Sequence, residues 1–255
     1  MNQAIIHQVR EKNPLIHHLT NEVTMNFVAD GLLSFGGSPV MAKALEEVDE
    51  MTSHSNGVFI NIGTPTEKDL PAMIAAGKTA NKYGIPVVID PVGIAATSYR
   101  ANYIHQVLSK VKPTVIKGNA GEIAYLADTP WEVKGVDSLG DESAIDIARK
   151  VANKYETAVV VTGKTDIICT KNKVSENITG HPYLTKVTGG GCLLGSVITA
   201  CLATEASIDD QLLTAVSFYG LAANYATSLQ QVTGPGSFKS AFIDALSYDI
   251  NKLKG

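Results

Sequence analysis

The sequence predicts a three-layer α/β/α fold with a mainly parallel central sheet, in a single domain that spans residues 1–255. Short apolar segments alternate with amphipathic helical segments along most of the chain, which is typical of a parallel sheet flanked by helices. The segments VVID and AVVVT are also rich in valine and isoleucine, as expected of strands that are buried on both faces. An α/β chain of this length is commonly one domain.

The predicted elements follow one another in a regular order. The strands are Leu15–Leu19, Ser38–Met41, Val58–Ile62, Pro86–Asp90, Thr114–Lys117 and Ala158–Thr162. The helical patterns between them are Thr24–Ser34, Glu67–Lys82, Asn102–Val111 and Glu142–Tyr155. Beyond these, Asp166–Thr170 and Lys173–Asn177 predict a short hairpin. The remaining chain predicts three helices, at Gly191–Ala203, Asp209–Leu229 and Phe238–Lys252.

Composition excludes several classes of protein. Apolar residues make up 45% of the chain and charged residues 18%, so the chain can build a core and is not of the disordered class. The net charge is −4 and the basic residues are not clustered, so neither nucleic-acid nor membrane binding has electrostatic support. No run of about 18 apolar residues predicts a membrane span.

The cysteines and the N-terminus indicate a cytoplasmic protein. The charged residues inside the first apolar stretch are not typical of a signal peptide. Cys169, Cys192 and Cys201 have no metal-binding spacing, and their odd number does not suit a disulfide framework. We therefore expect free thiols in a reducing compartment.

Four predicted strands end in polar or glycine-containing segments. They are Asn61-Ile62-Gly63-Thr64, Asp90-Pro91-Val92-Gly93, Lys117-Gly118-Asn119 and Thr162-Gly163. Ligands of open α/β sheets bind at the carboxyl ends of the strands, so these segments together predict a binding crevice at one edge.

Asp90 and Glu122 are the candidate magnesium ligands at that edge. An unpaired carboxylate at the end of a buried strand, such as Asp90, is costly, and Mg²⁺ typically takes one or two protein carboxylates. Glu122 lies at the start of a helix after Asn119. For Glu122 alone, capping of that helix is the favoured interpretation.

The segment VTGGGCLLGS contains three glycines, Gly189–Gly191, directly before a predicted helix. They leave the amides of the first turn unobstructed, which together with the helix dipole favours an anion site for phosphate. A flexible loop that only lets the helix pack closely is an equal alternative. Cys192 lies in the first turn, where the dipole is expected to lower its pKa and favour the thiolate. The alternative, a small buried apolar residue, suits Cys169 and Cys201 better.

Two other patterns do not support a site. Gly163-Lys164-Thr165 resembles the end of a P-loop, but the glycine required five positions before Gly163 is replaced by Ala158. His17 and His18 have no partner at a metal-binding spacing, and we expect them to pack and form hydrogen bonds within a strand.

Several of these segments, in this order, resemble the hydroxyethylthiazole kinases of the ribokinase-like superfamily. The resemblance begins with NPLIHHLTNEVTMNFVADGLLSFGGSPVMA, continues through NIGT, VVIDPVG and KGNAGEI, and ends with VTGGGCLLGS and GPGSF. It therefore covers nearly the whole chain. In most of the superfamily the glycine turn ends in an aspartate that acts as a base, whereas this chain, like the family, has a cysteine there.

The resemblance implies a ribokinase-like fold and a function. The family uses ATP and Mg²⁺ to phosphorylate the hydroxyl group of 4-methyl-5-(2-hydroxyethyl)thiazole in thiamine biosynthesis and salvage. It also implies a homotrimer with active sites at the subunit interfaces.

The resemblance assigns residues as well. It implies Cys192 at the reaction centre, and Asp90 and Glu122 at the magnesium and phosphate region. Lys117 and Thr162 are implied to contact ATP, although arginine is common in the family where this chain has Lys117. Asn21, Met41 and Gly189 are implied to lie at the thiazole pocket.

Three alternative functions remain. One is another ribokinase-like enzyme, either a hydroxymethylpyrimidine-type kinase or a nucleotide-dependent dehydratase, against which Cys192 and the block TNEVTMNFVADGLL argue. Another is a non-catalytic thiazole or nucleotide binder. The third is a cysteine hydrolase, for which no histidine is suitably placed in the sequence and which has no need of a phosphate site.

Overall fold

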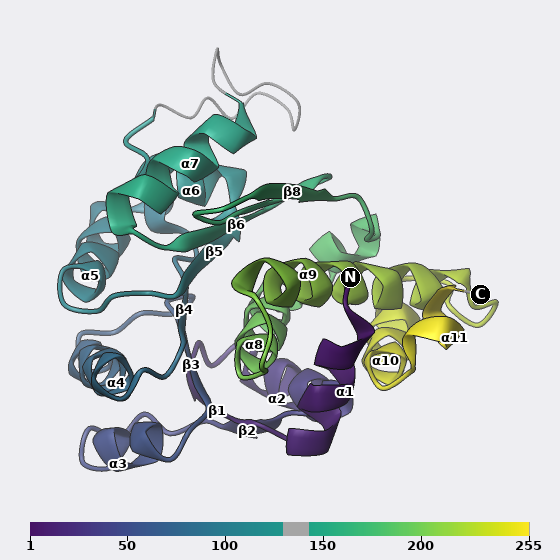
Figure 1. Ribbon diagram of the computed structural model, residues 1–255, viewed down its shortest axis with the longest axis horizontal. Coiled ribbons are helices and arrows are strands. Elements are labelled where there is room, and N and C mark those ends of the chain that lie inside the picture. The colour runs from purple at the N-terminus through teal and green to yellow at the C-terminus, as the bar shows by residue number, and fades with distance from the viewer. Residues whose placement is uncertain (130–142, 255) are drawn as a thin grey trace.

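A computed structural model describes residues 1–129 and 143–254 of the protein. Within these residues, eight strands form one sheet in the order β2-β1-β3-β4-β5-β6-β7-β8 (Figure 1). The strands are β1 (Leu15–Leu19), β2 (Ser38–Val40), β3 (Gly57–Asn61), β4 (Val87–Asp90), β5 (Val115–Asn119), β6 (Ala158–Thr162), β7 (Asp166–Cys169) and β8 (Val174–Asn177). β1 to β6 pair in parallel, and β7 and β8 add an antiparallel hairpin. The predicted mainly parallel sheet and its hairpin are confirmed.

Helices cover both faces of this sheet, which gives the three layers that the sequence predicts (Figure 1). One face carries α1 (Gln3–Lys12), α2 (Met25–Phe35), α8 (Gly190–Leu202), α9 (Ile208–Ser228), α10 (Pro235–Leu246) and α11 (Ile250–Lys254). The other face carries α3 (Val48–Ser53), α4 (Leu70–Tyr83), α5 (Ser98–Leu108), α6 (Ala120–Leu126) and α7 (Ala144–Tyr155). Short 3-10 helices lie at Ile94–Ala96 and Pro182–Lys186.

Each inner strand supplies side chains to both layers, which explains its continuous apolar sequence. In β4, Val88 belongs to the core beneath α8, whereas Val87 and Ile89 belong to the core beneath α4 and α5. All three are fully buried. A strand that is covered by helices on both faces has no side that faces solvent. Polar and apolar residues therefore do not alternate along it, and polar residues appear only where the strand ends.

The C-terminal region differs from the prediction. The single helix expected at Phe238–Lys252 is wrong, because the structure has α10 and α11 with a break between them. At the break, the Arg10 guanidinium donates hydrogen bonds to the carbonyl oxygens of Leu246 and Tyr248 and pairs with Asp249. These long-range partners satisfy the carbonyl groups that a continued helix would have used. Glu142, the expected start of α7, lies outside the described residues.

The strand order places a topological switch point between β1 and β3. The chain leaves β1 through α2 on one face and leaves β3 through α4 on the other. The carboxyl ends of these neighbouring strands therefore border a crevice, the position where open α/β sheets bind ligands. α8 packs against β1, β3 and β4, so its first turn lies at this crevice. No helix of the described residues has both the length and the apolar character needed to cross a membrane.

The two histidines of β1 are structural, as predicted. His17 bonds the Thr52 hydroxyl and the Ala42 carbonyl through its two ring nitrogens. His18 is fully buried and lies 2.7 Å from the Ser196 hydroxyl, which joins β1 to α8. Burial lowers the pKa of His18 to about 4.

The pKa of His18 predicts a pH dependence of stability. Between pH 6.5 and 4 the folded protein holds His18 neutral while the unfolded chain protonates it, so the free energy of unfolding falls as the pH falls. His18→Gln removes this contribution. From pH 7 to pH 4 the variant is expected to lose about 3 kcal/mol less stability than the wild type. Urea unfolding across this range measures the difference, and parallel curves for the two proteins would contradict it.

Candidate active site

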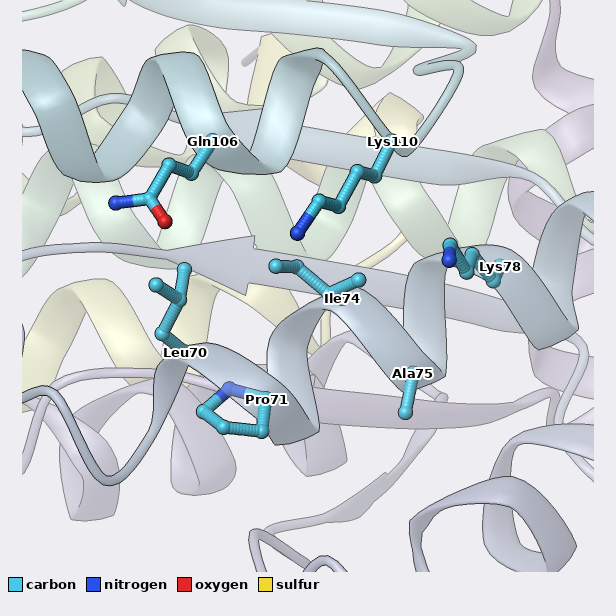
Figure 2. Close-up of a pocket in the computed structure, with 7 residues that line it drawn as sticks. All are labelled: Leu70, Pro71, Ile74, Ala75, Lys78, Gln106 and Lys110. Carbon is cyan, nitrogen blue, oxygen red and sulfur yellow. The ribbon is translucent and has the colours of Figure 1, made fainter.

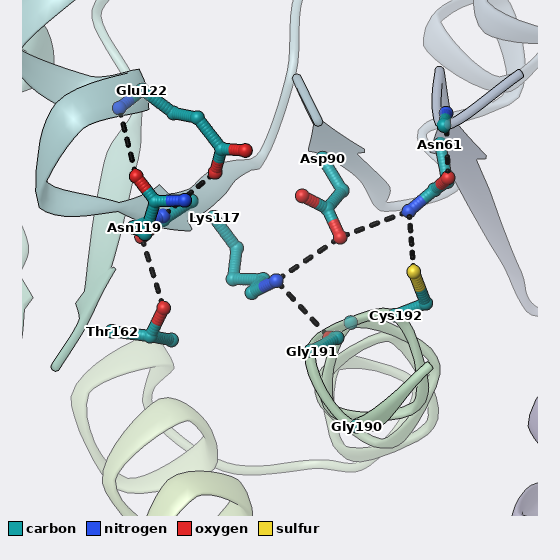
Figure 3. A network of polar contacts seen from close by, with 12 residues as sticks. Asn61, Asp90, Lys117, Asn119, Glu122, Thr162, Gly190, Gly191 and Cys192 are labelled. Atoms are coloured by element: carbon teal, nitrogen blue, oxygen red, sulfur yellow. Dashed lines mark hydrogen bonds and ion pairs between the residues drawn. The ribbon is translucent and has the colours of Figure 1, made fainter. Parts of the chain in front are cut away.

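The first turn of α8 faces the carboxyl ends of β3, β4 and β5 (Figure 3). Asn61 ends β3, Asp90 ends β4 and Lys117 lies near the end of β5. The register pairs Asn61 directly with Asp90, so the two side chains meet at the edge. The predicted gathering of polar strand ends is thus present, and the glycine turn lies against it.

Asn61 links the crevice residues together. Its Nδ2 donates to Asp90 Oδ2 at 3.0 Å and lies 3.3 Å from Cys192 Sγ. Its Oδ1 accepts hydrogen bonds from Asn21 Nδ2 and the Gly63 amide, at 2.8 and 3.0 Å. The sequence marks Asn61 only as part of a strand end, and its central position follows from the pairing of β3 with β4.

Lys117 and Asp90 form a buried ion pair. Lys117 Nζ lies 3.0 Å from Asp90 Oδ2 and also donates to the Gly191 carbonyl oxygen at 3.0 Å. The two side chains are 4% and 1% exposed, so water screens this pair very little. Burial lowers the pKa of Lys117, but the nearby Asp90, Glu122 and Cys192 outweigh it and raise the pKa above its ordinary value. The Lys117 side chain is therefore a cation in the folded protein.

The two carboxylates of the site differ in their hydrogen bonds. Asp90 Oδ1 is buried and has no hydrogen-bond partner among the described residues. Glu122 accepts from the backbone amides of Gly93 and Asn119, each at 2.8 Å. The Asn119 side chain in turn accepts from the Glu122 amide, which completes a capping box at the start of α6. The capping role of Glu122 is confirmed. Burial, followed by the repulsion of Asp90, raises the pKa of the Glu122 carboxyl.

The backbone explains why the turn before α8 consists of glycines. Gly189 caps the helix with φ +95°, a conformation that side chains disfavour, and a Cβ there would lie 3.0 Å from atoms of Thr24 and Phe27. A Cβ on Gly190 would lie 2.6 Å from the Leu184 carbonyl oxygen. The turn thus packs closely against its neighbours, as the close-packing alternative also expects, and its role as an anion site stays a prediction.

Two amides of this turn remain free. The Gly190 amide donates to the Val187 carbonyl, and the Leu193 amide begins the helix by donating to Gly189. The amides of Gly191 and Cys192 have no acceptor in the part of the chain that the structure describes. Free amides at the start of a 13-residue helix, where the dipole is positive, favour the binding of an anion.

The expected thiolate of Cys192 is a wrong prediction. Burial raises the pKa of the Cys192 thiol, and the negative charge of Asp90 raises it further. These effects outweigh the attraction of Lys117 and the hydrogen bonds from neighbouring side chains. The helix position alone predicts a shift of the pKa in the opposite direction, because the sequence does not reveal the carboxylate across the crevice. Cys192 is therefore a neutral thiol.

The other predicted site residues surround this centre. Asn21 Nδ2 lies 3.6 Å from Cys192 Sγ. Asn21 Oδ1 accepts a hydrogen bond from the Thr24 backbone amide. Thr162 donates to the Gly118 carbonyl beside β5. Met41 is half-buried and packs against the same apolar core as Cys192. The ligands assigned to these residues stay predictions.

A separate groove lies on the helical layer that contains α4 and α5 (Figure 2). It runs between α4 and α5 and is lined by Leu70, Pro71, Ile74, Ala75, Lys78, Gln106 and Lys110. None of the strand-end residues lines it, so it is not part of the candidate active site.

Comparison with known proteins identifies the class first. The fold resembles that of a ribokinase-like superfamily protein from Enterococcus faecalis, with a TM-score of 0.66 at 13% identity over 96% of this chain and 94% of that chain. The structure of a hydroxyethylthiazole kinase protein from Pyrococcus horikoshii matches with a TM-score of 0.89 and 34% identity, covering 99% and 95% of the two chains. The protein is thus an α/β enzyme with the ribokinase-like fold.

The family follows from the sequence comparisons. The model of the hydroxyethylthiazole kinase family matches residues 6–251. A protein named hydroxyethylthiazole kinase 1 from Oceanobacillus iheyensis is 61% identical over 247 residues, which is 97% of this chain and 96% of that protein. The chain belongs to the hydroxyethylthiazole kinase family, and it is a kinase.

The close approach at Gly190 predicts the effect of an added methyl group. Gly190→Ala is expected to lower the free energy of unfolding by about 1–3 kcal/mol, because its Cβ meets the rigid Leu184 carbonyl. Gly236→Ala is a matched control in the first turn of α10, where a Cβ meets nothing within 4 Å. Thermal and urea unfolding compare the variants. Equal stability of the two variants would show that the turn before α8 yields to a side chain.

Proposed function

We propose that the protein transfers the γ-phosphoryl group of ATP to the hydroxyl group of 4-methyl-5-(2-hydroxyethyl)thiazole in thiamine salvage. Membership of the family supports the substrates. The observation that carries the chemistry is the pair of free amides of Gly191 and Cys192, in the helical turn whose Gly191 carbonyl contacts Lys117. Such preorganised donors stabilise charge on a transferring phosphoryl group.

The proposed roles of the individual residues come from the resemblance to the family. The phosphoryl group rests over Gly189–Gly191, and the substrate hydroxyl lies beside Cys192. Asn21, Met41 and Gly189 bind the thiazole on the side of β1 and β2. Lys117 and Thr162 contact ATP on the side of β5 and β6.

Mg²⁺ is part of this proposal, with Asp90 and Glu122 as the residues that hold it. The buried Oδ1 of Asp90, which lacks a hydrogen-bond partner among the described residues, fits a cation. Mg²⁺ typically takes only one or two protein carboxylates, so these two side chains would suffice. When bound, the ion would neutralise phosphate charge.

Cys192 assists the reaction as a neutral thiol. Phosphoryl transfer passes through a loose transition state in which positioning and electrostatics dominate, so little is required of a base. The thiol accepts a hydrogen bond from Asn61 and borders the free amides, where it orients the substrate hydroxyl. The neutral thiol cannot accept a further proton, so the hydroxyl proton passes to an oxygen of the transferred phosphoryl group as the new bond to phosphorus forms and the bond to ADP breaks.

We also propose a homotrimer with active sites at the subunit interfaces, working in the cytoplasm. Two exposed apolar side chains support the assembly, Val23 beside Asn21 and Leu45 beyond Met41, with 69% and 52% exposure. A neighbouring copy that covers them would also enclose the thiazole pocket. The three cysteines are free, which suits a reducing compartment.

An ATP-consumption assay tests the proposed substrates. The thiazole alcohol is expected to support turnover with Mg²⁺, whereas pyrimidine alcohols are expected to support little. Omission of Mg²⁺ should abolish most of the activity, because the charge on the phosphates is then not neutralised. The absence of turnover with the thiazole alcohol would rule out the proposed acceptor and leave the fold unaffected.

Substitution of Cys192 tests its role. Cys192→Asp restores the carboxylate found in most of the superfamily and is expected to keep or raise kcat. Cys192→Ala keeps the backbone amides and removes the thiol that orients the substrate hydroxyl, so kcat is expected to fall by only about tenfold, because the demand on a base is low. Steady-state kinetics and a check of folding by circular dichroism decide the outcome. A folded but inactive Cys192→Asp variant would count against the placement of the substrate hydroxyl beside this position.

A further inference from the structure

The two free amides of the glycine turn belong to two consecutive peptide groups. A peptide group is planar and joins the carbonyl of one residue to the amide of the next. The free Gly191 amide is therefore fixed to the Gly190 carbonyl, and the free Cys192 amide to the Gly191 carbonyl. In a helix the amides point toward the N-terminus and the carbonyls toward the C-terminus, so each carbonyl points away from the amide of its own peptide group.

Both of these carbonyls accept a hydrogen bond from a buried side chain. The Tyr219 hydroxyl lies 2.5 Å from the Gly190 carbonyl oxygen, and Lys117 Nζ lies 3.0 Å from that of Gly191. Tyr219 comes from α9, is 3% exposed and packs edge-to-face on Phe242 at a centroid distance of 4.9 Å. Burial raises the pKa of Tyr219, so its hydroxyl keeps its proton and donates it.

A hydrogen bond to a carbonyl group polarises the whole peptide group and makes its amide a better donor. It also fixes the plane of the peptide, and glycine has no side chain that would otherwise restrict it. Because the carbonyl oxygen of each of these two peptide groups accepts such a hydrogen bond, we expect the two bonds to have the same role.

We propose that Tyr219 is a positioning residue for phosphoryl transfer, whose hydroxyl orients and polarises the Gly190–Gly191 peptide so that the Gly191 amide donates to the transferring group. This inference rests on the proposed function of the glycine turn. Tyr219 does not contact substrate and acts through the backbone. Lys117 acts on the next peptide in the same way, but it also pairs with Asp90, so Tyr219 gives the cleaner test.

Tyr219→Phe removes only the hydroxyl group and leaves the ring in place. Removal of a whole oxyanion donor costs about 100–1000-fold in kcat, so weakening one is expected to lower kcat by about tenfold. The KM values for ATP and the thiazole alcohol should change by less than about twofold, because donors that act on the transition state affect kcat. Inhibition by ADP, Mg²⁺ and aluminium fluoride, which mimic the transferring group, should weaken by the same factor as kcat.

Tyr103→Phe is the matched control. Tyr103 is 1% exposed, and among the described residues its hydroxyl has one hydrogen-bond partner, Met73 Sδ at 3.5 Å, in the core on the other face of the sheet. Both variants lose one buried hydroxyl, so thermal unfolding corrects for the general effect on stability. The control is expected to keep the kcat of the wild type. A Tyr219→Phe variant with the same kcat and the same inhibition as Tyr103→Phe would overturn the proposal.

A spectroscopic measurement tests the same inference without turnover. With ¹⁵N-glycine labelling, the Gly191 amide signal of Tyr219→Phe is expected to move upfield and to respond less to ADP, Mg²⁺ and aluminium fluoride than in the wild type. An unchanged signal would overturn the proposal. If the wild type fails to phosphorylate the thiazole alcohol, the proposed function is wrong, whereas this signal still decides the role of Tyr219.

Discussion

The Lys117 ammonium group joins the end of β4 to the first turn of α8, and the candidate site depends on this contact. Asp90, Glu122 and Cys192 surround a position that water scarcely reaches, and each of them raises the pKa of Lys117. Without a cation, the buried Asp90 carboxylate would be left uncompensated, which is strongly destabilising. The ammonium group is a compact charge with three donors, so it reaches both the carboxylate and the Gly191 carbonyl.

The packing of α8 against the sheet fixes the free amides of its first turn relative to the strand ends. The helix is buried along nearly its whole length, and His18 joins it to β1 through Ser196. Gly195 lets it lie directly against Phe59 of β3, since a side chain there would overlap the aromatic ring. Because these contacts hold the helix against the sheet, its free amides keep a fixed position relative to Asp90. A site built on rigid elements in this way is preorganised for a charged transition state.

Much of the fold could be predicted because it follows from local patterns. Continuous Val and Ile mark the inner strands, and the polar residues that follow them mark the ligand-binding edge. Asp90 and Lys117 were predicted at this edge for that reason, whereas their ion pair depends on the adjacent β4 and β5 and on burial. α1 was not predicted, because only Ile5, Ile6 and Val9 are buried in a mostly polar segment. Tyr219 gives no signal in sequence, since it lies 29 residues from the carbonyl that it contacts.

The pKa of Cys192 shows where local reasoning fails. The helix dipole acts within one element and can be read from the sequence, but desolvation and the charge of Asp90 come from the assembled crevice. The same holds for the break between α10 and α11, which depends on Arg10 from the other end of the chain. Interactions between segments that are distant in the sequence thus set both the pKa of Cys192 and the break between α10 and α11.

The proposed chemistry requires that the amides of Gly191 and Cys192 hold the transferring phosphoryl group. A crystal structure of the wild type with ADP, Mg²⁺, aluminium fluoride and the thiazole alcohol tests it most directly. Fluoride atoms are expected within hydrogen-bonding distance of both amides, with the alcohol oxygen in line beside Cys192 Sγ. An aluminium fluoride group bound elsewhere, with the two amides facing water, would contradict it.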